Sequence, residues 1–446
     1  MIPITVCDGS QELELLALLK ARGGEVDAKI TAMVTEILAT VREKGDAAVR
    51  GFTHQFDVLG RRDTMQVVAE VRASHAYDDG ESREIPRQVL EDAVRRSNPD
   101  FIAALERAAA RIRAFHERQK RQSFFSAEED GVILGQRIRP LRRVGIYVPG
   151  GTALYPSSVL MNVIPAKIAG VPEIVMVTPE QPGGGGDLGI LAAALVAGVD
   201  RVFLVGGAQA TAALAYGTET IPQADKIVGP GNIFVATAKK LLYGTVDIDM
   251  IAGPSEILIV ADETANPRWL AADLLSQAEH DRLSSAILLS TSQNLAEATV
   301  RALELQLAKL PRRELAEAAL RDFGAVLVCE NLPQAIRLAN DFAPEHLELC
   351  IANPMDSLGA IDNAGSVFLG HYSPEPVGDY CAGPNHVLPT GGTSRFFSPL
   401  SVDDFLKKIQ FISYTEPALA KVREDVILLA ETEGLTAHAN AVRVRF

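Results

Sequence analysis

The sequence predicts an α/β protein with two parallel-sheet units, a helical N-terminal region and a small helical module at the C-terminus. Short apolar runs alternate with helical stretches through residues 144–216 and again through residues 257–369. Glycine, proline or charged residues bound these runs, as they commonly bound buried strands. This alternation is typical of βαβ units, in which the strands lie parallel in one sheet.

The region before the first apolar run is predicted to be mostly helical. Residues 26–52 and 87–122 carry apolar side chains at helical spacing, for example Ile30, Val34 and Leu38. Such spacing gives a helix one apolar face, which has to pack against another element.

The elements of the two α/β units follow in chain order. In the first unit we expect strands at residues 144–148, 173–178 and 201–205, and helices at 157–168, 188–197 and 208–216. In the second we expect strands at 257–261, 286–290, 324–329, 347–351 and 365–369, and helices at 268–279, 295–309 and 332–342. The tail, residues 402–446, is predicted to be helical with a break at Gly434. Since so short a tail buries little surface alone, it should dock elsewhere.

The composition excludes several classes of function. The formal net charge of −14 argues against a general nucleic-acid or anionic-membrane binder, which needs clustered Lys and Arg. No stretch approaches the roughly 18 apolar residues of a membrane span, and the N-terminus lacks the basic start of a signal peptide. The four cysteines share no C-x-x-C spacing, which fits free thiols in a reducing cytoplasm.

Four short polar clusters hold four of the chain's eight histidines, each with Gln, Asp or Glu beside it. They are Q-A-E-H (277–280), A-P-E-H-L (343–347), G-D-Y-C-A-G-P-N-H (378–386) and E-T-E-G-L-T-A-H (431–438). The pattern indicates a site assembled from distant segments, with a metal and an acid–base pair as its contents. The remaining histidines are interpreted as structural or solvated: His54, His75, His116 and His371.

The first two clusters each allow two interpretations. Gln277 and His280 are three residues apart on a predicted helix, so both face one side and can share a metal ion. A solvated last helical turn, where histidine suits the helix dipole, explains the same pair. Glu345 and His346 follow a helix-ending proline and can transfer protons, in two separate roles, although an exposed pair is the alternative.

The last two clusters add further candidate ligands. Asp379 offers a carboxylate and His386 an imidazole on a backbone fixed by glycine and proline, while Cys381 is expected to be buried and inert. Glu433 and His438 flank the helix break in the tail. His438 can act as a ligand only if the tail reaches the other clusters, in its own chain or in a partner.

Three glycine-rich turns follow strands and precede helices: 149–151, 206–209 and 229–232. Such turns direct helix N-termini and backbone N–H groups toward an anionic ligand. None matches G-x-G-x-x-G or a P-loop, so an unspecified phosphate compound or nucleotide is the expected ligand. The alternative interpretation is that these segments are only tight turns of the α/β scaffold and bind no ligand.

Together these segments closely resemble the histidinol dehydrogenase family over residues 26–445. The resemblance is carried by motifs in one order: R-V-G-I-Y-V-P-G-G, V-G-G-A-Q-A, V-G-P-G-N, A-G-P-S-E-I-L-I-V-A-D, L-L-S-Q-A-E-H, A-P-E-H-L-E-L, G-D-Y-C-A-G-P-N-H-V-L-P-T and E-G-L-T-A-H. It implies oxidation of L-histidinol to L-histidine through histidinal by two NAD molecules, at the end of histidine biosynthesis. Both sheet units would be incomplete Rossmann-like domains.

The resemblance also implies roles for individual residues. One Zn²⁺ per subunit would be bound by Gln277, His280, Asp379 and His438, the last from the partner in an intertwined homodimer. His346 would be the general base for the alcohol, and Glu345 would activate water in the second step. The substrate would contact these six residues and also Ser255, His386 and Glu433. NAD would contact Tyr147, Gln209 and Asn232.

The expected domains are a segment at 1–25, a first α/β domain from 26–143 and 254–400, an NAD-binding domain at 144–253, and a C-terminal tail at 401–446, which should dock on the partner subunit.

A related dehydrogenase acting on another small alcohol, such as a sulfonated propanediol, is the alternative function. A zinc-dependent hydrolase and a non-catalytic zinc-stabilised scaffold represent other classes. The hydrolase gives the glycine turns no role, and the scaffold gives the proton carriers none.

Overall fold

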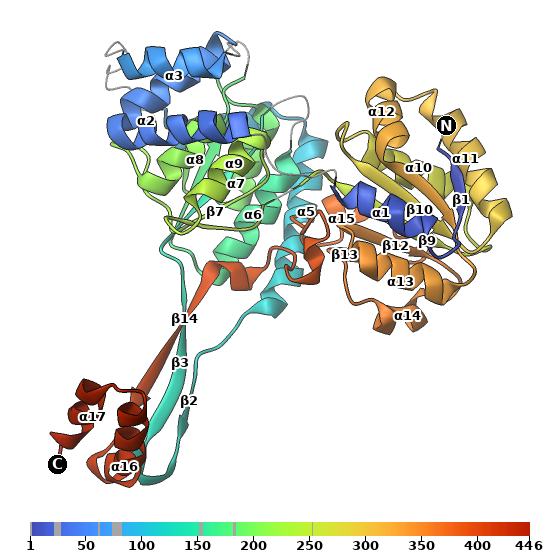
Figure 1. Ribbon diagram of the computed structural model, residues 1–446. Helices are drawn as coiled ribbons and strands as arrows, with labels where there is room; N and C mark the ends of the chain where they lie inside the picture. The colour runs from blue at the N-terminus through green and yellow to red at the C-terminus, as the bar shows by residue number, and fades with distance from the viewer. Residues whose placement is uncertain are drawn as a thin grey trace.

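The chain forms two α/β units side by side, from which a narrow arm leads to the C-terminus (Figure 1). The computed structural model describes residues 2–21, 28–60, 63–73, 83–150, 155–181, 184–251 and 253–446. Of the residues and turns singled out above, His75, Gly151 and the first residue of the A-G-P-S-E motif lie outside these ranges. Within the described ranges, no helix is both long and apolar enough to cross a membrane.

The first of the two parallel sheets, which we call the larger sheet, has six strands in the order β1-β11-β10-β9-β12-β13. Their bounds are Ile4–Val6 (β1), Glu256–Ala261 (β9), Ser285–Ser290 (β10), Gly324–Val328 (β11), His346–Cys350 (β12) and Ser366–Leu369 (β13). The inner strands are buried on both faces, which is why their sequences are continuous apolar runs.

Helices cover both faces of the larger sheet. One core contains apolar residues of α10, α11 and α12, and the other contains residues of α1 and α13. These helices span Gln11–Ala21 (α1), Pro267–Ala278 (α10), Gln293–Leu307 (α11), Arg313–Phe323 (α12) and Leu332–Phe342 (α13), and the short helices α14 and α15 span Pro354–Ser357 and Glu375–Tyr380. The N-terminal segment therefore belongs to this unit, since β1 pairs with β11.

The smaller sheet has five parallel strands in the order β6-β5-β4-β7-β8. They span Arg143–Tyr147 (β4), Glu173–Thr178 (β5), Arg201–Leu204 (β6), Lys226–Val228 (β7) and Asp247–Ile248 (β8). Its connecting helices are Pro156–Ala169 (α6), Leu188–Ala197 (α7), Gly207–Tyr216 (α8) and Ile233–Leu242 (α9). Helix α7 illustrates the local signals, because Asp187 caps its N-terminus and Gly198 ends it in a left-handed conformation.

The N-terminal helices pack on the smaller sheet, which differs from the domain grouping that we predicted. They span Ala28–Thr53 (α2), Thr64–Ala73 (α3), Arg87–Arg96 (α4) and Pro99–His116 (α5). Apolar residues of α2 and α3 share one core with α8 and α9, and those of α4 and α5 share another with α6 and α7. An apolar helix face does not specify which of two sheets it covers. Residues 87–122 also divide into two helices, because Asn98 and Pro99 start a new one.

The arm corrects the prediction of a wholly helical tail. Its sheet of three antiparallel strands, in the order β14-β3-β2, joins Phe124–Ala127 (β2), Ile133–Pro140 (β3) and Leu406–Ser413 (β14). Helices Glu416–Thr432 (α16) and Thr436–Arg443 (α17) follow at its end (Figure 1). The pairing of β14 with β3 joins residues more than 250 positions apart in the sequence, so no local sequence pattern indicates it.

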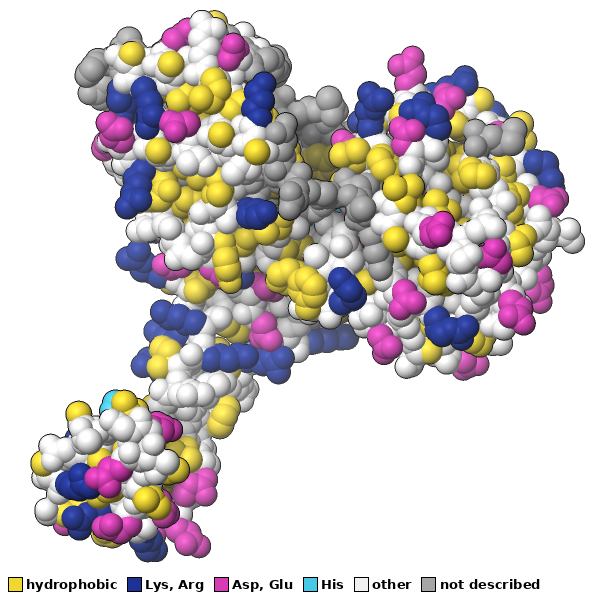
Figure 2. Space-filling model, in the orientation of Figure 1, with side chains coloured by type: hydrophobic (Ala, Val, Ile, Leu, Met, Phe, Trp, Pro, Cys, Tyr) yellow, Lys and Arg dark blue, Asp and Glu magenta, His cyan; other side chains and the backbone are white. Residues whose placement is uncertain are grey.

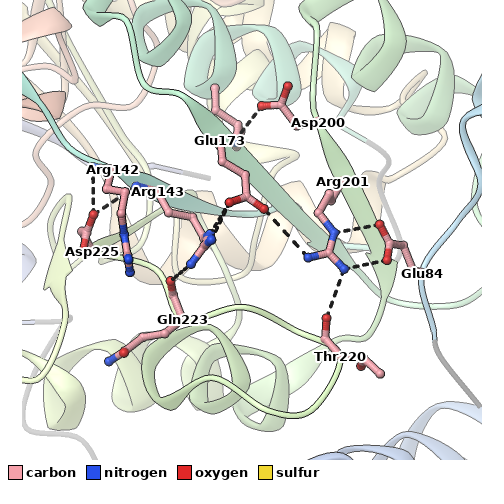
Figure 3. A network of polar contacts seen from close by, with 10 residues as sticks. Glu84, Arg142, Arg143, Glu173, Asp200, Arg201, Thr220, Gln223 and Asp225 are labelled. Atoms are coloured by element: carbon pink, nitrogen blue, oxygen red, sulfur yellow. Dashed lines mark hydrogen bonds and ion pairs between the residues drawn. The ribbon is translucent and has the colours of Figure 1, made fainter. Parts of the chain in front are cut away.

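A network of ion pairs closes the amino edge of the smaller sheet (Figure 3). Arg201 contacts Glu84 at 2.7 Å and Glu173 at 3.8 Å, and Arg143 contacts Glu173 at 2.5 Å. Asp225 accepts hydrogen bonds from the backbone of this edge. These residues tie the starts of three strands together, on the side opposite to the glycine turns.

Candidate functional site

Most of the predicted site residues meet at the amino edge of the larger sheet. Glu256 begins β9 and His346 begins β12, and the two strands are neighbours. Helix α10 leaves the carboxyl end of β9 and returns the chain to the amino end of β10, so its C-terminal residues Gln277 and His280 lie at the same edge. Asp379 comes from α15, which follows β13.

A group suited to a metal ion lies at this edge. One ligand atom each from His280, Glu375 and Asp379 lies within 4.8 Å of the others. Gln277 is 1% exposed, and its Oε1 finds no hydrogen-bond partner among the described residues. An amide oxygen, an imidazole and carboxylates form a credible donor set for Zn²⁺, so the residues present fit the expected ion. Sequence analysis missed Glu375, whose only local signal is a carboxylate near the third cluster.

His346 is buried, and the two nitrogens of its ring have different environments. Nδ1 lies 2.9 Å from the carbonyl oxygen of Glu256, which can only accept, so Nδ1 carries the proton. Nε2 has no hydrogen-bond partner within the described part of the chain and lies 3.9 Å from Glu375 Oε1. Its lone pair is therefore open toward the group of candidate ligands.

Burial lowers the pKa of His346 below its ordinary value. The Asp379 carboxylate and the Glu256 carbonyl oppose this shift, while His280 and His386 add to it. The ring is accordingly neutral near pH 7, which is the state that a general base requires.

Glu345 lies beside the ring, with Oε2 at 3.7 Å from His346 Nδ1. The same oxygen accepts a hydrogen bond from the backbone N–H of Glu256 at 2.8 Å. The predicted proton carriers are thus adjacent, and the two separate roles given to them above stay a prediction.

Burial makes several nearby carboxyl groups resist ionisation. Burial first, and then the charge of Asp379, raises the pKa of Glu375 to about 10. Burial also raises the pKa of Asp273 to about 6 and, with Asp273, the pKa of Glu348. Without a bound cation, Glu375 next to Asp379 is therefore neutral at pH 7. A divalent cation would favour the ionised form of Glu375.

His386 joins the site from the third cluster. Its Nδ1 lies 3.2 Å from the carbonyl oxygen of Asp379, and its Nε2 lies 3.3 Å from Ser158 Oγ on α6. It therefore connects the candidate ligands to the other α/β unit.

Cys381 is exposed, contrary to our prediction that it is buried, because the short helix α15 ends at Tyr380 and leaves Cys381 at the surface.

Two cavities open at these residues. One of about 440 Å³ is lined by Phe101 and Leu105 of α5 and, from the other unit, by His280 and Asp379. The second, of about 260 Å³, is lined by His346 together with Asp379 and His386. Ser255 lies at the same edge, where its carbonyl oxygen accepts from Ser285 N. The first cavity lies where the two units meet and is large enough for a small molecule.

Two predicted residues stay apart from this group. Glu433 and His438 lie at the end of the arm and are exposed, and neither contributes to the group of ligand atoms around His280. Figure 1 shows α16 and α17 at the far end of the arm, away from α15. Within one chain, the fourth predicted ligand does not complete the site.

The predicted cofactor residues lie at the carboxyl edge of the smaller sheet. Tyr147 ends β4, and its hydroxyl accepts a hydrogen bond from Gly207 N at 3.0 Å. Gln209 is buried in the first turn of α8, and Asn232 caps α9 through its side-chain oxygen. Gln209 Nε2 and the hydroxyl of Thr178, at the end of β5, are buried without a hydrogen-bond partner among the described residues.

A buried ion pair holds the turn before Asn232. Lys239 of α9 contacts the Asp249 carboxylate and donates to the carbonyl oxygen of Gly229 at 3.0 Å, and Asp249 accepts from Gly229 N at 2.8 Å. Both charges are almost wholly buried, so they depend on each other. The turn and helix N-terminus are thereby fixed at the edge where parallel sheets commonly bind ligands.

Replacing Gly229 by alanine is expected to destabilise the protein by about 2 kcal/mol or more, because strain and a backbone clash combine. Its φ is +110°, and an added Cβ would lie 2.1 Å from the carbonyl oxygen of Tyr147. Gly244→Ala is the matched control, since Gly244 has φ +99° and no described atom within 4 Å of its Cβ position. Denaturant unfolding of both variants measures the difference, and equal losses would show that the clash relaxes.

Comparisons with known proteins cover nearly the whole chain. The family model described as histidinol dehydrogenase matches residues 20–446. Histidinol dehydrogenase of Clostridium acetobutylicum is 51% identical over 440 residues, or 98% of each chain. That of Listeria monocytogenes is 52% identical over 434 residues, or 97% of each. The crystal structure of the enzyme from Elizabethkingia anophelis matches with a TM-score of 0.89 and 36% identity, covering 100% of this chain and 98% of that one.

Proposed function

The chain belongs to the histidinol dehydrogenase family, and from this premise we propose that it oxidises L-histidinol to L-histidine through histidinal with two molecules of NAD. The observation that carries the proposal is the position of His346, whose Nε2 lies 3.9 Å from Glu375 of the candidate ligand group, at a cavity that Asp379 also lines. Oxidation of an alcohol to an acid needs a base, a hydride acceptor and an activated water. His346 would be the base, and Glu345 would activate the water.

Gln277, His280 and Asp379 would hold the zinc ion, with His438 of a second copy as the fourth ligand. The unpartnered Oε1 of Gln277 supports this assignment, because a buried amide oxygen without a donor is costly. When bound, zinc supplies a Lewis acid that holds the imidazole and amine of the substrate. Ser255 and His386, together with Glu433 from the tail of a second copy, would provide the remaining substrate contacts.

His346 would remove the hydroxyl proton of histidinol in the first step. Its Nδ1–H is held by Glu256, so the proton is received at Nε2. The carbon then loses hydride and becomes the aldehyde. When bound, NAD supplies the acceptor for this hydride.

Glu345 would act in the second step, on water. Its Oε2 accepts a hydrogen bond from Glu256 N at 2.8 Å, which orients the carboxylate to take a proton as the water oxygen adds to the aldehyde carbon. A second hydride transfer from that carbon then gives the acid. Since Glu345 lies beside the His346 ring, one bound aldehyde stays close to both proton carriers.

Tyr147, Gln209 and Asn232 would bind NAD at the carboxyl edge of the smaller sheet. Support comes from the buried, unpartnered Nε2 of Gln209 and from the N-termini of α8 and α9, which favour phosphate. The missing dinucleotide fingerprint fits an incomplete Rossmann-like unit. Thr178 Oγ1 is a further unpartnered group at this edge that sequence analysis did not single out.

The arm supports a homodimer in which each tail completes the other site. Nearly every residue of β2 and β14 is exposed, including Phe125 at 70% and Ile412 at 73%. Figure 2 shows hydrophobic side chains along the arm and on its end module. So small a sheet has no core of its own when both faces meet water. A second copy of the chain would cover these faces and bring His438 to the zinc ligands.

The decisive assay is the yield of NADH per histidinol. We expect two NADH for each histidinol consumed, and loss of the reaction after dialysis against a chelator, with recovery on adding Zn²⁺. Dihydroxypropanesulfonate at the same concentration is the control substrate and should give no NADH. Turnover of that alcohol in preference to histidinol, or any turnover without NAD, would contradict the proposal.

A further inference from the structure

The starts of β9 and β12 exchange hydrogen bonds through two glutamates. Glu256 N donates to Glu345 Oε2 at 2.8 Å, and Glu345 N donates to Glu256 Oε2 at 3.2 Å. Each side chain therefore binds the backbone of the other residue. Glu256 is completely buried, so these bonds form where water does not compete for them.

Glu256 makes two further contacts at the same edge. Its second carboxylate oxygen, Oε1, accepts a hydrogen bond from Gly391 N at 3.2 Å. Its carbonyl oxygen accepts from Nδ1 of His346 at 2.9 Å. One residue thus contacts both proposed proton carriers and the loop after the third cluster. That loop is also tied back to the residues before β9, because Thr390 Oγ1 accepts from Gly253 N.

We propose that Glu256 is a positioning residue that holds Glu345 and His346 in their working orientations. It acts through these two residues and does not touch the reacting atoms. Its backbone N–H fixes the Glu345 carboxylate, and its carbonyl fixes the His346 ring with Nε2 toward the candidate ligands. Its side chain keeps that backbone in place by anchoring it to Glu345 N and Gly391 N. The inference rests on the proposed function, which assigns the proton carriers.

The carboxylate is required because it meets two backbone donors with two acceptor oxygens. Glutamine has the same shape but only one acceptor oxygen, so its NH₂ group would face either Glu345 N or Gly391 N. One of the two anchors is then lost, and a donor faces a donor in a buried position. Small displacements of this kind reduce rates strongly when the groups that move carry the chemistry.

The test is Glu256→Gln in the full-length enzyme. We expect kcat to fall about 10- to 100-fold with histidinol and also with histidinal, since both carriers share the anchor. Zinc content and the KM for NAD should stay unchanged. Glu256→Asp keeps two acceptor oxygens on a shorter side chain and should retain more activity than Glu256→Gln. It also serves as the test variant if the glutamine protein does not fold.

Ser285→Ala is the matched control. Ser285 pairs with Glu256 on the opposite side of β9, is completely buried, and loses one hydrogen bond to Phe323 O. It should lose stability without losing kcat. Glu345→Gln and His346→Asn are assayed in parallel, because their failure to reduce turnover would overturn the proposed function itself. If they reduce it while Glu256→Gln keeps the wild-type kcat, or loses no more than Ser285→Ala, the positioning role is wrong.

Discussion

A heterodimer of one His280→Ala subunit and one His438→Ala subunit is expected to have about half the wild-type activity, although each variant is inactive as a homodimer. If the tail acts on the partner, the His438→Ala subunit keeps an intact set of ligands in its core and receives His438 from the other chain. That site is complete. The second site of the same dimer lacks both ligands.

Differently tagged subunits allow the heterodimer to be purified and its NADH production to be measured. Mixing two wild-type tagged chains is the control for any loss caused by the procedure. If His438 acts within its own chain, neither site of the heterodimer is complete and it stays inactive. If the chain is monomeric, the two tags do not purify together.

His346→Asn is expected to lower the rate of the first hydride transfer by about 10²- to 10⁴-fold. The asparagine amide can still donate to the carbonyl oxygen of Glu256 but offers no basic nitrogen at the position of Nε2. Single-turnover formation of NADH from histidinol measures this step. His371→Asn is the matched control, since His371 bonds Thr264 away from the site and should leave the rate unchanged.

The same assignment fixes the direction of the pH dependence. Burial holds the pKa of His346 below its ordinary value, and the neutral ring is the active form. Activity should therefore be constant through neutral pH and fall only below the ordinary histidine pKa of about 6.5. Asp379 opposes this shift, whereas His280, His386 and a bound cation act in the same direction as burial. Loss of the first step already above pH 7 would contradict the assignment.

Local sequence patterns predicted the parallel-sheet units well. Most of the predicted strands and helices differ from the observed elements by only a few residues, because continuous apolar runs and helical spacing record burial directly. The arm was missed, because β3 and β14 alternate weakly and pair across most of the chain. The packing of α2 was also misassigned, since an amphipathic helix carries no information about which sheet it covers.

The candidate site, like the fold, was predicted only in part. His280, Asp379, Glu345 and His346 were predicted from clustered ligand types and from a family resemblance, and the structure brings them to one edge. Glu256 and Glu375 were not predicted, because a glutamate at the start of an apolar strand or in a short helix looks like an ordinary boundary residue. Their importance lies in contacts with distant residues, such as Glu345 for Glu256 and His280 for Glu375.

The sequence by itself determined the types of residues available: metal ligands, proton carriers and glycine turns, in an order specific to one family. Only the tertiary structure decided which edges they occupy. The proton carriers lie at the amino edge of the larger sheet because α10 returns the chain there, and the glycine turns lie at the carboxyl edge of the smaller sheet. Such positions depend on how strands stack and which units meet. These are long-range contacts that neighbouring residues in the sequence do not encode.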